Sequence, residues 1–405
     1  MAVGSGELGT LHTVGGVRMA AVSAGIKKAG RLDVVVFELA PGSVTAGVFT
    51  TNAFCAAPVT LCQQHLATTA PRYLLINTGN ANAGTGAPGL QAAKSCCEAL
   101  ATAAKVAANT VLPFSTGVIG ELLPAAKITA VVDAALTELA TNDWHKVALG
   151  IMTTDTRPKA SSRQLQLAGK TVTITGIAKG AGMIKPNMAT MLGYVFTDIG
   201  MTEVGAQSAV KQAADLSFNR ITVDGDTSTN DSCILVASNQ SGVHFDSLSA
   251  GDQQRFTAEL QTVFIELATA IIRDGEGATK FVTIRIEGGA TTQECLQVGY
   301  AIGESPLVKT ALFASDPNWG RILAAVGRAG LANLQIDNIE IWLDHVNIVR
   351  SGARAATYTE AAGQSVLSKE EFSIIVKLAR GSCVETLWTC DFSHDYVTIN
   401  AEYRT

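Results

Sequence analysis

The stretch that decides how this chain is interpreted is Lys179-Gly-Ala-Gly-Met-Ile-Lys-Pro-Asn-Met-Ala-Thr-Met-Leu-Gly193. A flexible glycine-rich segment and Pro186-Asn187 lead to the small residue Ala189 and then to Thr190. A strand-like run, Met191–Thr197, follows. Taken alone, the stretch is most typical of a loop that enters a buried strand, with Thr190 an ordinary strand residue.

The same residues could form a catalytic nucleophile if the bond between Ala189 and Thr190 were cut. Thr190 would then carry a nucleophilic hydroxyl and a free α-amine, and the amine can take the proton of the hydroxyl without a histidine. An α-amine has a reference pKa of about 7.7–8.0, which suits a general base near neutral pH. The small Ala189 would let the Thr190 hydroxyl reach the carbonyl that it must attack.

Composition excludes several classes of protein. Of the 405 residues, 47% are hydrophobic and 16% are charged, against a usual charged share of about 25%, so intrinsic disorder is excluded. The net charge of −5 and the lack of any Lys/Arg block argue against nucleic acid or an anionic membrane as a partner. No apolar run reaches the roughly 20 residues of a membrane span, and the N-terminus does not resemble a secretory signal. We therefore expect a soluble, cytoplasmic protein.

Periodicity predicts a mixed fold in which sheets are covered by helices, of the α/β or α+β class. A hairpin is expected over Arg163–Ile177, with its turn at Gly169-Lys170. Tyr396–Ile399 reads as strand-like, so the C-terminus should be docked. Other expected strands are Asp33–Leu39, Val44–Thr50, Tyr73–Asn77, Cys233–Ser238, Phe281–Glu287, Ile339–Asp344 and Phe372–Leu378. Expected helices are Leu90–Ala108, Ala125–Ala140, Thr202–Ser217, Gln253–Arg273 and Trp319–Ala329. A structural boundary is expected within residues 277–312.

Common catalytic signatures are missing from the chain. It has no GxSxG elbow, HExxH, phosphate loop or dinucleotide fingerprint, and its cysteines and histidines are too scattered to indicate a metal site. Thr116 and Gly117, in Phe114–Glu121, could offer a hydroxyl and a backbone N–H to an oxyanion, although a simple turn is the better interpretation of that segment alone.

Several polar loops leave open whether they bind a ligand or only complete a turn. Met152–Lys159 has clustered hydroxyls, and Glu276 follows a long helix. Asn77–Gly86 and the Asp-rich Val223–Asp231 follow strands, where such side chains more often satisfy backbone groups. The second of these loops lacks the spacing of a calcium-binding EF-hand loop.

Together these stretches resemble one family, the self-cleaving bifunctional ornithine acetyltransferase/glutamate N-acetyltransferases of arginine biosynthesis, which use a threonine nucleophile. KGAGMI followed by KPNMATML is highly specific. The matching stretches occur in order along nearly the whole chain: Gly47–Asn52, Asn77–Gly86, Ser115–Gly117, Met152–Thr156, Lys179–Leu192, Val223–Asp231, Asp274–Gly277, Asp316–Arg321 and Asn400–Thr405.

The resemblance implies cleavage between Ala189 and Thr190, giving an α chain of residues 1–189 and a β chain of residues 190–405. Thr190 would be the nucleophile, and Thr116 and Gly117 would form the oxyanion hole. The residues implied to line the substrate site are Thr153 (with Thr154 as the alternative), Lys179, Thr190, Glu276, Asn400 and Thr405. The implied fold is an αββα sandwich like that of self-processing aminopeptidases, followed by a smaller α/β portion. The implied assembly is a heterotetramer of two α and two β chains.

The implied reaction moves an acetyl group from N2-acetylornithine to glutamate through an acetyl-Thr190 intermediate, in a ping-pong cycle. This is glutamate N-acetyltransferase activity. Acetyl-CoA is a second candidate donor, which would add amino-acid acetyltransferase activity, and neither a metal nor any other cofactor is expected. Two alternatives stay open from the residues alone: an amidase or aminopeptidase that uses water as acceptor, and a non-enzymatic binding protein whose polar loops only hold a ligand.

Overall fold

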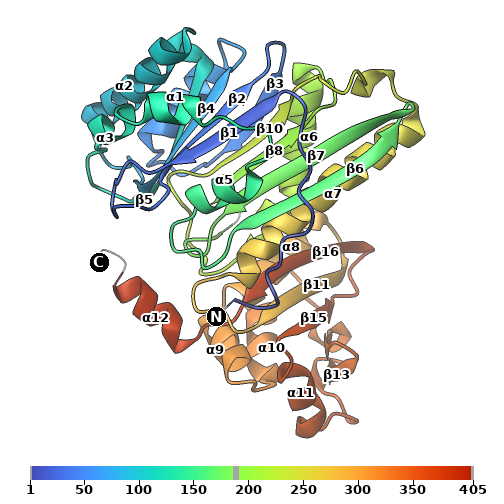
Figure 1. The fold of residues 1–405 in the computed structure, drawn as a ribbon. Helices are drawn as coiled ribbons and strands as arrows, with labels where there is room; N and C mark the ends of the chain where they lie inside the picture. The colour runs from blue at the N-terminus through green and yellow to red at the C-terminus, as the bar shows by residue number, and fades with distance from the viewer. Residues whose placement is uncertain (1, 186–190, 403–405) are drawn as a thin grey trace.

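The computed structural model describes residues 2–185 and 191–402. Two sheets lie face to face in the N-terminal part of the structure, and a third forms the C-terminal part (Figure 1). The first sheet has the order β1 (Val17–Val22), β2 (Val34–Leu39), β4 (Tyr73–Asn80) and β5 (Val111–Val118). The second has the order β3 (Val44–Phe49), β10 (Ser232–Ala237), β8 (Leu192–Thr197), β7 (Lys170–Lys179) and β6 (Lys159–Leu167).

The predicted hairpin is confirmed as β6 and β7, which pair antiparallel with Leu167 opposite Lys170. Ala168 and Gly169 form the turn with φ values of +47° and +76°. Two successive residues with positive φ match the right-handed twist of the strands that they join. The sequence identifies the hairpin because its apolar residues alternate on both sides of this turn.

The two sheets pack through an aromatic cluster. The ring centroids of Phe37 on β2 and Phe196 on β8 are 4.7 Å apart, and Trp144 of α5 (Trp144–Gly150) lies 5.4 Å from Phe196. Val35 and Phe37 face this inner core, whereas Val34 and Val36 face the outer one. Because both faces of β2 are buried, its sequence is an almost continuous apolar run.

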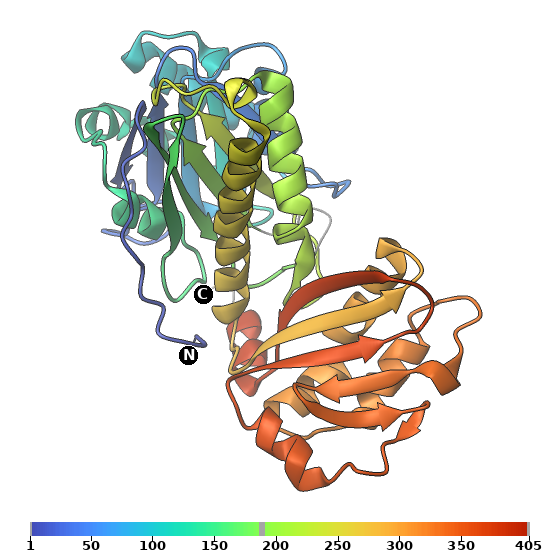
Figure 2. The same ribbon diagram turned by 90° about the vertical axis from the view of Figure 1, so that its right-hand side faces the viewer.

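Helices cover the outer faces of both sheets, so the N-terminal part is an αββα sandwich. The first sheet packs on helices that join its outer core, α1 (Ala57–Leu66), α2 (Gly86–Ala104), α3 (Ala125–Thr129) and α4 (Val132–Thr137). The second packs on α6 (Glu203–Asp215) and α7 (Ala250–Arg273), which Figure 2 shows beside each other on its outer face. This confirms the fold class expected from the sequence.

The single helix expected over Ala125–Ala140 is wrong, because the structure divides it into α3 and α4. Val131, between them, has a φ of −108° and a ψ of 4°, outside the helical range. β-Branched residues are crowded at the break and have low helix propensity. Ile128 before the break and Val132 after it are buried in the same core, so packing compensates for the interruption.

The third sheet has its own core. Its order is β14 (Ala353–Arg354), β13 (Val346–Arg350), β12 (Glu340–Leu343), β15 (Glu371–Lys377), β11 (Phe281–Gly289), β16 (Cys383–Cys390) and β9 (Ile221–Thr222). The helices of this part are α8 (Thr292–Gly303), α9 (Pro306–Phe313), α10 (Trp319–Gly327) and α11 (Glu360–Leu367). Short 3₁₀ turns occur at Ala108–Thr110, Phe218–Arg220, Phe245–Ser247 and Ile336–Asn338. The long helix α7 leads from the sandwich to β11 (Figure 2).

The strand expected at Tyr396–Ile399 is also wrong, because these residues lie in helix α12 (His394–Ala401). The β-branched Val397, Thr398 and Ile399 favour a strand by propensity alone, but tertiary contacts override that preference. The Tyr396 hydroxyl lies 3.4 Å from Asp224 Oδ2, and Asn400 Nδ2 donates to Glu276 Oε2 at 2.8 Å, and both partners are distant in the sequence. The C-terminal segment is therefore docked as a helix.

Within the ranges that the structure describes, we find no helix with the length and apolar character needed to cross a bilayer.

Candidate functional site

One cavity brings together the described residues that the sequence analysis selects. Thr116 and Gly117 come from the end of β5, Lys179 from the end of β7, and Glu276 from the turn after α7. The cavity is also lined by Thr153, Thr154 and Asn400. Ala189, Thr190 and Thr405 lie outside the described residues. The roles of all these residues stay predictions, although those described share one cavity.

Gly117 lies where two strand backbones approach too closely for a side chain. It pairs with Gly79 on β4 and has a φ of +135°. A Cβ at this position would lie 2.3 Å from the carbonyl carbon of Gly79 and 2.5 Å from the nitrogen of Asn80. Only glycine fits, for reasons of both space and conformation. The Thr116–Gly117 backbone therefore borders the cavity in a fixed position, as an oxyanion hole requires.

Lys179 brings a cation to the cavity wall. Its side chain is buried, and its Nζ lies 3.2 Å from the hydroxyl oxygen of Thr116. Burial lowers the pKa of Lys179, whereas the charges of Asp155, Glu276 and Asp231 raise it. Within the described ranges, no carboxylate forms a direct ion pair with Lys179.

A buried ion cluster, which the sequence analysis misses, holds this part of the site. Lys159 Nζ lies 2.6 Å from both Asp155 Oδ1 and Asp274 Oδ2. Asp155 also accepts hydrogen bonds from the backbone N–H of Thr153, at 2.9 Å, and of Gly180, at 2.8 Å. Burial raises the pKa of Asp155, but the charges of Lys159 and Lys179 outweigh burial and hold it below its usual range. One carboxylate thus fixes both the Thr153 loop and the residue that follows Lys179.

Asp274 anchors the other side of this cluster. It accepts hydrogen bonds from the backbone N–H of Thr156, at 3.0 Å, and from the Thr156 hydroxyl. The sequence did carry a signal for the cluster: Asp155 and Lys159 lie in the hydroxyl-rich loop, and Asp274 begins the Asp274–Gly277 turn. Nothing in the sequence shows that these segments, more than 100 residues apart, meet.

Glu276 places a carboxylate in the same cavity. It is 7% exposed, and its Oε2 accepts a hydrogen bond from Asn400 Nδ2 at 2.8 Å. A Cβ on Gly182 would lie 2.3 Å from that oxygen, so the glycine-rich segment after Lys179 makes room for Glu276. The hydrogen bond from Asn400 ties α12 to the site. The docked C-terminal segment is therefore part of the cavity wall.

Side chains of the Asp-rich loop Val223–Asp231 accept hydrogen bonds from backbone N–H groups near the site. Asp224 accepts from the N–H groups of Met183 and Ile184, at 2.6 and 2.9 Å. Asp231 accepts from the N–H of Met191 at 3.0 Å. Burial raises the pKa of Asp231 well above its ordinary value, while that hydrogen bond, the Ser228 hydroxyl and the charge of Lys179 lower it. The interpretation that these side chains satisfy backbone groups is confirmed.

The N-terminal part is thus an αββα sandwich that carries this cavity where β5 and β7 end. Comparison with known proteins then gives the family. The ArgJ family model matches residues 18–405. The chain belongs to the ArgJ family.

Curated relatives match over the full length. The chain is 56% identical to the arginine biosynthesis bifunctional protein ArgJ of Pseudomonas fluorescens over 408 residues, covering 100% of both chains. It is 52% identical to the ArgJ protein of Psychrobacter arcticus, covering 98% of each.

Solved structures of the family match parts of the chain. The Bacillus halodurans ArgJ structure is 36% identical, covers 52% of this chain and 99% of its own, and gives a TM-score of 0.49. An ornithine acetyltransferase from Mycobacterium tuberculosis, solved with ornithine, is 36% identical, covers 43% of this chain and 93% of its own, and gives a TM-score of 0.38.

Proposed function

We propose that this chain transfers the acetyl group of N2-acetylornithine to glutamate in arginine biosynthesis, through an acetyl-Thr190 intermediate. Family membership supports the reaction, and the cavity supplies groups that suit it. The observation that carries the proposal is the presence of a buried cation and a buried carboxylate, Lys179 and Glu276, in one cavity with the Thr116–Gly117 backbone.

The charges of the cavity match both amino acids. Lys179 is suited to the α-carboxylate that acetylornithine and glutamate share. Glu276 is suited to the side-chain ammonium of ornithine, and the Asn400 amide and the threonine hydroxyls can serve the side-chain carboxylate of glutamate. One cavity must accept both a cationic and an anionic side chain, so its hydroxyl-rich wall is consistent with the two half-reactions.

The proposed chemistry begins with cleavage between Ala189 and Thr190, which frees the Thr190 amine. The Thr190 hydroxyl attacks the acetyl carbonyl and its amine takes the proton. The oxyanion is held by Thr116 and Gly117. The bond to the ornithine nitrogen breaks, the proton passes to the leaving amine, and acetyl-Thr190 remains. The amine of glutamate then attacks this ester, and the Thr190 oxygen leaves and regains its proton.

The proposal extends to the assembly and the setting of the enzyme. The cleaved chains, residues 1–189 and 190–405, would form a heterotetramer of two α and two β chains in the cytoplasm. Acetyl-CoA as a second donor, and the absence of a metal or any other cofactor, are part of the same proposal.

Initial-rate kinetics test the covalent intermediate. With both acetylornithine and glutamate varied, double-reciprocal plots are expected to be parallel, because ornithine leaves before glutamate reacts. Intersecting lines would contradict an acetyl-enzyme. Measuring acetylglutamate against free acetate in the same assays separates transfer from hydrolysis, since an amidase would release acetate at the rate of ornithine release.

Asp155→Asn is expected to lower kcat/KM about 100-fold, because the amide presents a donor to the Thr153 N–H or to Lys159 and shifts the loop that lines the cavity. Breaking a buried ion pair should also lower the free energy of unfolding by about 3 kcal/mol. A carboxyl group whose pKa is lower in the folded than in the unfolded protein stabilises the fold at pH values above its unfolded pKa. This stabilisation is lost as the pH falls through the pKa of the folded protein. The difference in the free energy of unfolding between wild type and variant should therefore become smaller in acid.

A purely structural role for Asp155 would leave the pH profile unchanged. Loss of its negative charge should lower the pKa of Lys179 further, so the alkaline limb of kcat/KM should move to lower pH. The exposed Asp133 provides the matched control, since Asp133→Asn removes the same charge from the surface. An alkaline limb that stays in place in Asp155→Asn would contradict the positioning role.

A further inference from the structure

The proposed self-cleavage needs a group that the acetyl transfer does not use. In the uncut chain the nitrogen of Thr190 belongs to an amide, so it cannot take the proton of the Thr190 hydroxyl as the free α-amine does after cleavage. Another group must accept that proton while the hydroxyl attacks the Ala189 carbonyl. The residues assigned so far to the nucleophile, the oxyanion hole and the substrate do not include this proton acceptor.

Asp231 is held beside Met191, the residue that follows Thr190 in the chain. The parallel strands β10 and β8 begin one residue after Asp231 and Met191 and pair in register from there. The Met191 N–H donates to Asp231 Oδ1 at 3.0 Å, and the Asp231 carbonyl accepts from the Thr50 N–H at 3.0 Å. Strand pairing and these hydrogen bonds fix the place of the Asp231 carboxyl group.

Covalent geometry keeps the Thr190 hydroxyl near this carboxyl group, although Thr190 itself lies outside the described residues. The Met191 nitrogen is bonded to the carbonyl carbon of Thr190, and the hydroxyl oxygen is joined to that carbon through Cα and Cβ. Standard bond lengths therefore limit the distance between the Met191 nitrogen and the hydroxyl oxygen to about 5 Å. The Asp231 carboxyl group is hydrogen-bonded to the same nitrogen, so it lies close to the reacting oxygen.

One oxygen of the Asp231 carboxyl group receives no hydrogen bond from residues 2–185 and 191–402. Asp231 is 1% exposed, and its Oδ2 is the buried oxygen without a donor. The Ser228 hydroxyl and the charge of Lys179 favour the ionised form, but neither donates a hydrogen bond to Oδ2. An unpaired buried oxygen is destabilising, so its presence beside the cleavage site calls for a functional explanation.

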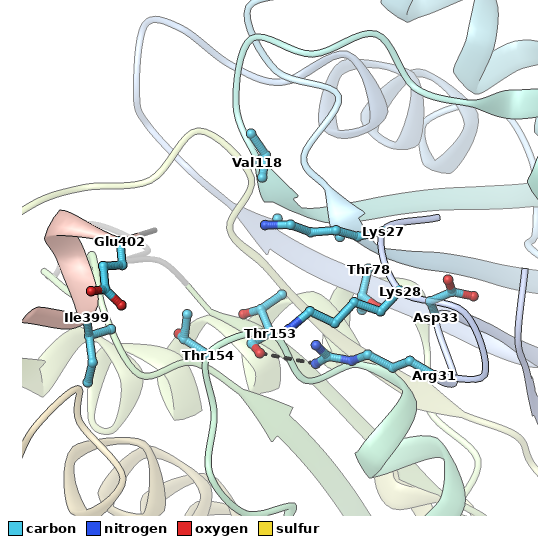
Figure 3. A pocket seen from close by; sticks show the side chains of 12 residues that line it. Lys27, Lys28, Arg31, Asp33, Thr78, Val118, Thr153, Thr154, Ile399 and Glu402 are labelled. Atoms are coloured by element: carbon cyan, nitrogen blue, oxygen red, sulfur yellow. Dashed lines mark hydrogen bonds between the residues drawn. The ribbon is translucent and has the colours of Figure 1, made fainter. Parts of the chain in front are cut away.

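The other carboxylates around the cavity have different partners or face a different space. Asp155 forms a buried ion pair, and Glu276 accepts a hydrogen bond from Asn400. Figure 3 shows Glu402, just after α12, on the wall of an adjoining pocket. Asp231, in contrast, is bonded directly to the segment that follows the cleavage site.

We propose that Asp231 Oδ2 is the proton acceptor for self-cleavage of the uncut chain. Burial raises the pKa of Asp231 from its ordinary value toward the range that suits a general base near neutral pH. This role is separate from the hydrogen bond that Oδ1 accepts from the backbone. The inference rests on the proposed function, since the cleavage at Thr190 is the first step of that function.

The cleavage balances with water as the only added reactant. Asp231 takes the hydroxyl proton as the Thr190 oxygen bonds to the Ala189 carbonyl carbon. The carbon–nitrogen bond then breaks, and the proton passes from Asp231 to the released nitrogen, which becomes the α-amine. Ala189 is now held as an ester on the Thr190 oxygen. Water hydrolyses this ester to the Ala189 carboxylate and the free Thr190 hydroxyl.

Two substitutions of Asp231 separate proton transfer from support of the backbone. Asp231→Asn keeps an oxygen that can accept from the Met191 N–H, but it replaces Oδ2 with an amide nitrogen that cannot take a proton, at almost unchanged size. Asp231→Ala removes both functions. Asp226→Asn is the matched control, because it makes the same change at an exposed side chain of the same loop.

The test measures the rate of self-cleavage. Each full-length chain is made by cell-free translation, and loss of the 42.1 kDa species is followed by intact mass. Cleavage should be at least about 100-fold slower in both Asp231→Asn and Asp231→Ala, the lower end of what a general base contributes. Asp226→Asn should be cleaved within twofold of the wild-type rate. Added formate should speed up cleavage of Asp231→Ala, whereas formamide, of similar size but not a base, should not.

Cleavage of Asp231→Asn at the wild-type rate would overturn the proposal. If Asp231→Ala alone were slow, the role of Asp231 would be to support the backbone, and Lys179 would be the next candidate for the proton acceptor. Thermal unfolding shows whether each chain is folded; if Asp231→Asn is not, equal rates of Asp231→Ala with formate and formamide would overturn the proposal. Failure of the proposed function is distinguishable, because the wild-type chain itself would then stay whole.

Discussion

A chain carrying Thr190→Ala is expected to stay a single species of 42.1 kDa, whereas the wild-type protein is expected to separate under denaturing conditions into two species of about half that mass. Without the Thr190 hydroxyl, neither the attack on the Ala189 carbonyl nor the formation of acetyl-Thr190 can take place. Transfer from acetylornithine to glutamate should fall by at least about 10⁴-fold, the scale of effect seen when a nucleophile is removed. Intact-mass measurement and a steady-state assay check the two effects.

Thr190→Ser is the matched control, because it keeps the hydroxyl and the α-amine. We expect it to be cleaved at the same bond and to retain measurable transfer. Cleavage of Thr190→Ala between residues 189 and 190 would show that another group carries out the processing. A single 42.1 kDa species in fresh wild-type protein would show that Thr190 has no free amine, and the mechanism would fail at its first step.

The mixed class of helix-covered sheets could be predicted from the sequence because its strands are strongly patterned, whereas the sandwich arrangement was implied only by the family resemblance. β2 reads as an apolar run since both of its faces are buried, and the β6–β7 hairpin shows apolar alternation on both sides of a glycine turn. Predictions from local residue preferences were wrong where tertiary packing determined the structure. α12 forms from strand-favouring residues because Tyr396 and Asn400 contact Asp224 and Glu276, which are brought near only in the folded protein.

The cavity was predictable only in part. Thr116, Gly117 and Lys179 lie in motifs that sequence alone can select. The ion cluster that supports them could not be found in this way, since Lys159 joins Asp155 and Asp274 from segments over 100 residues apart.

Two glycines of the cavity are needed because they have no side chain, which the sequence alone did not indicate. Gly182 was interpreted as part of a flexible segment, but it makes room for the Glu276 carboxylate. A Cβ on Gly182 would lie 2.3 Å from Glu276 Oε2. Gly117 was selected for its N–H, yet its lack of a side chain is equally necessary. A close approach between two backbones cannot be read from one sequence, because the partner strand is unknown.

Gly117→Ala is therefore expected to lower kcat by about 10²–10³-fold, the cost of losing one oxyanion-hole donor. The new methyl group would lie 2.3 Å from the Gly79 carbonyl carbon, so β5 must shift at the point where it borders the cavity. KM for acetylornithine should change less, because Lys179 and Glu276 come from other elements. Steady-state kinetics measure the split between kcat and KM, and intact mass shows whether the chain is still processed.

Gly120→Ala separates crowding from backbone strain. Gly120 also has a positive φ, +85°, but a Cβ there meets nothing within 4 Å. Both variants carry the conformational cost of alanine at positive φ, and only Gly117→Ala adds the clash with β4. Gly120→Ala should keep kcat within a few-fold of wild type. If folded, processed Gly117→Ala had the kcat of wild type, the Thr116–Gly117 backbone would not stabilise the oxyanion. The donor would then have to be sought elsewhere in the cavity.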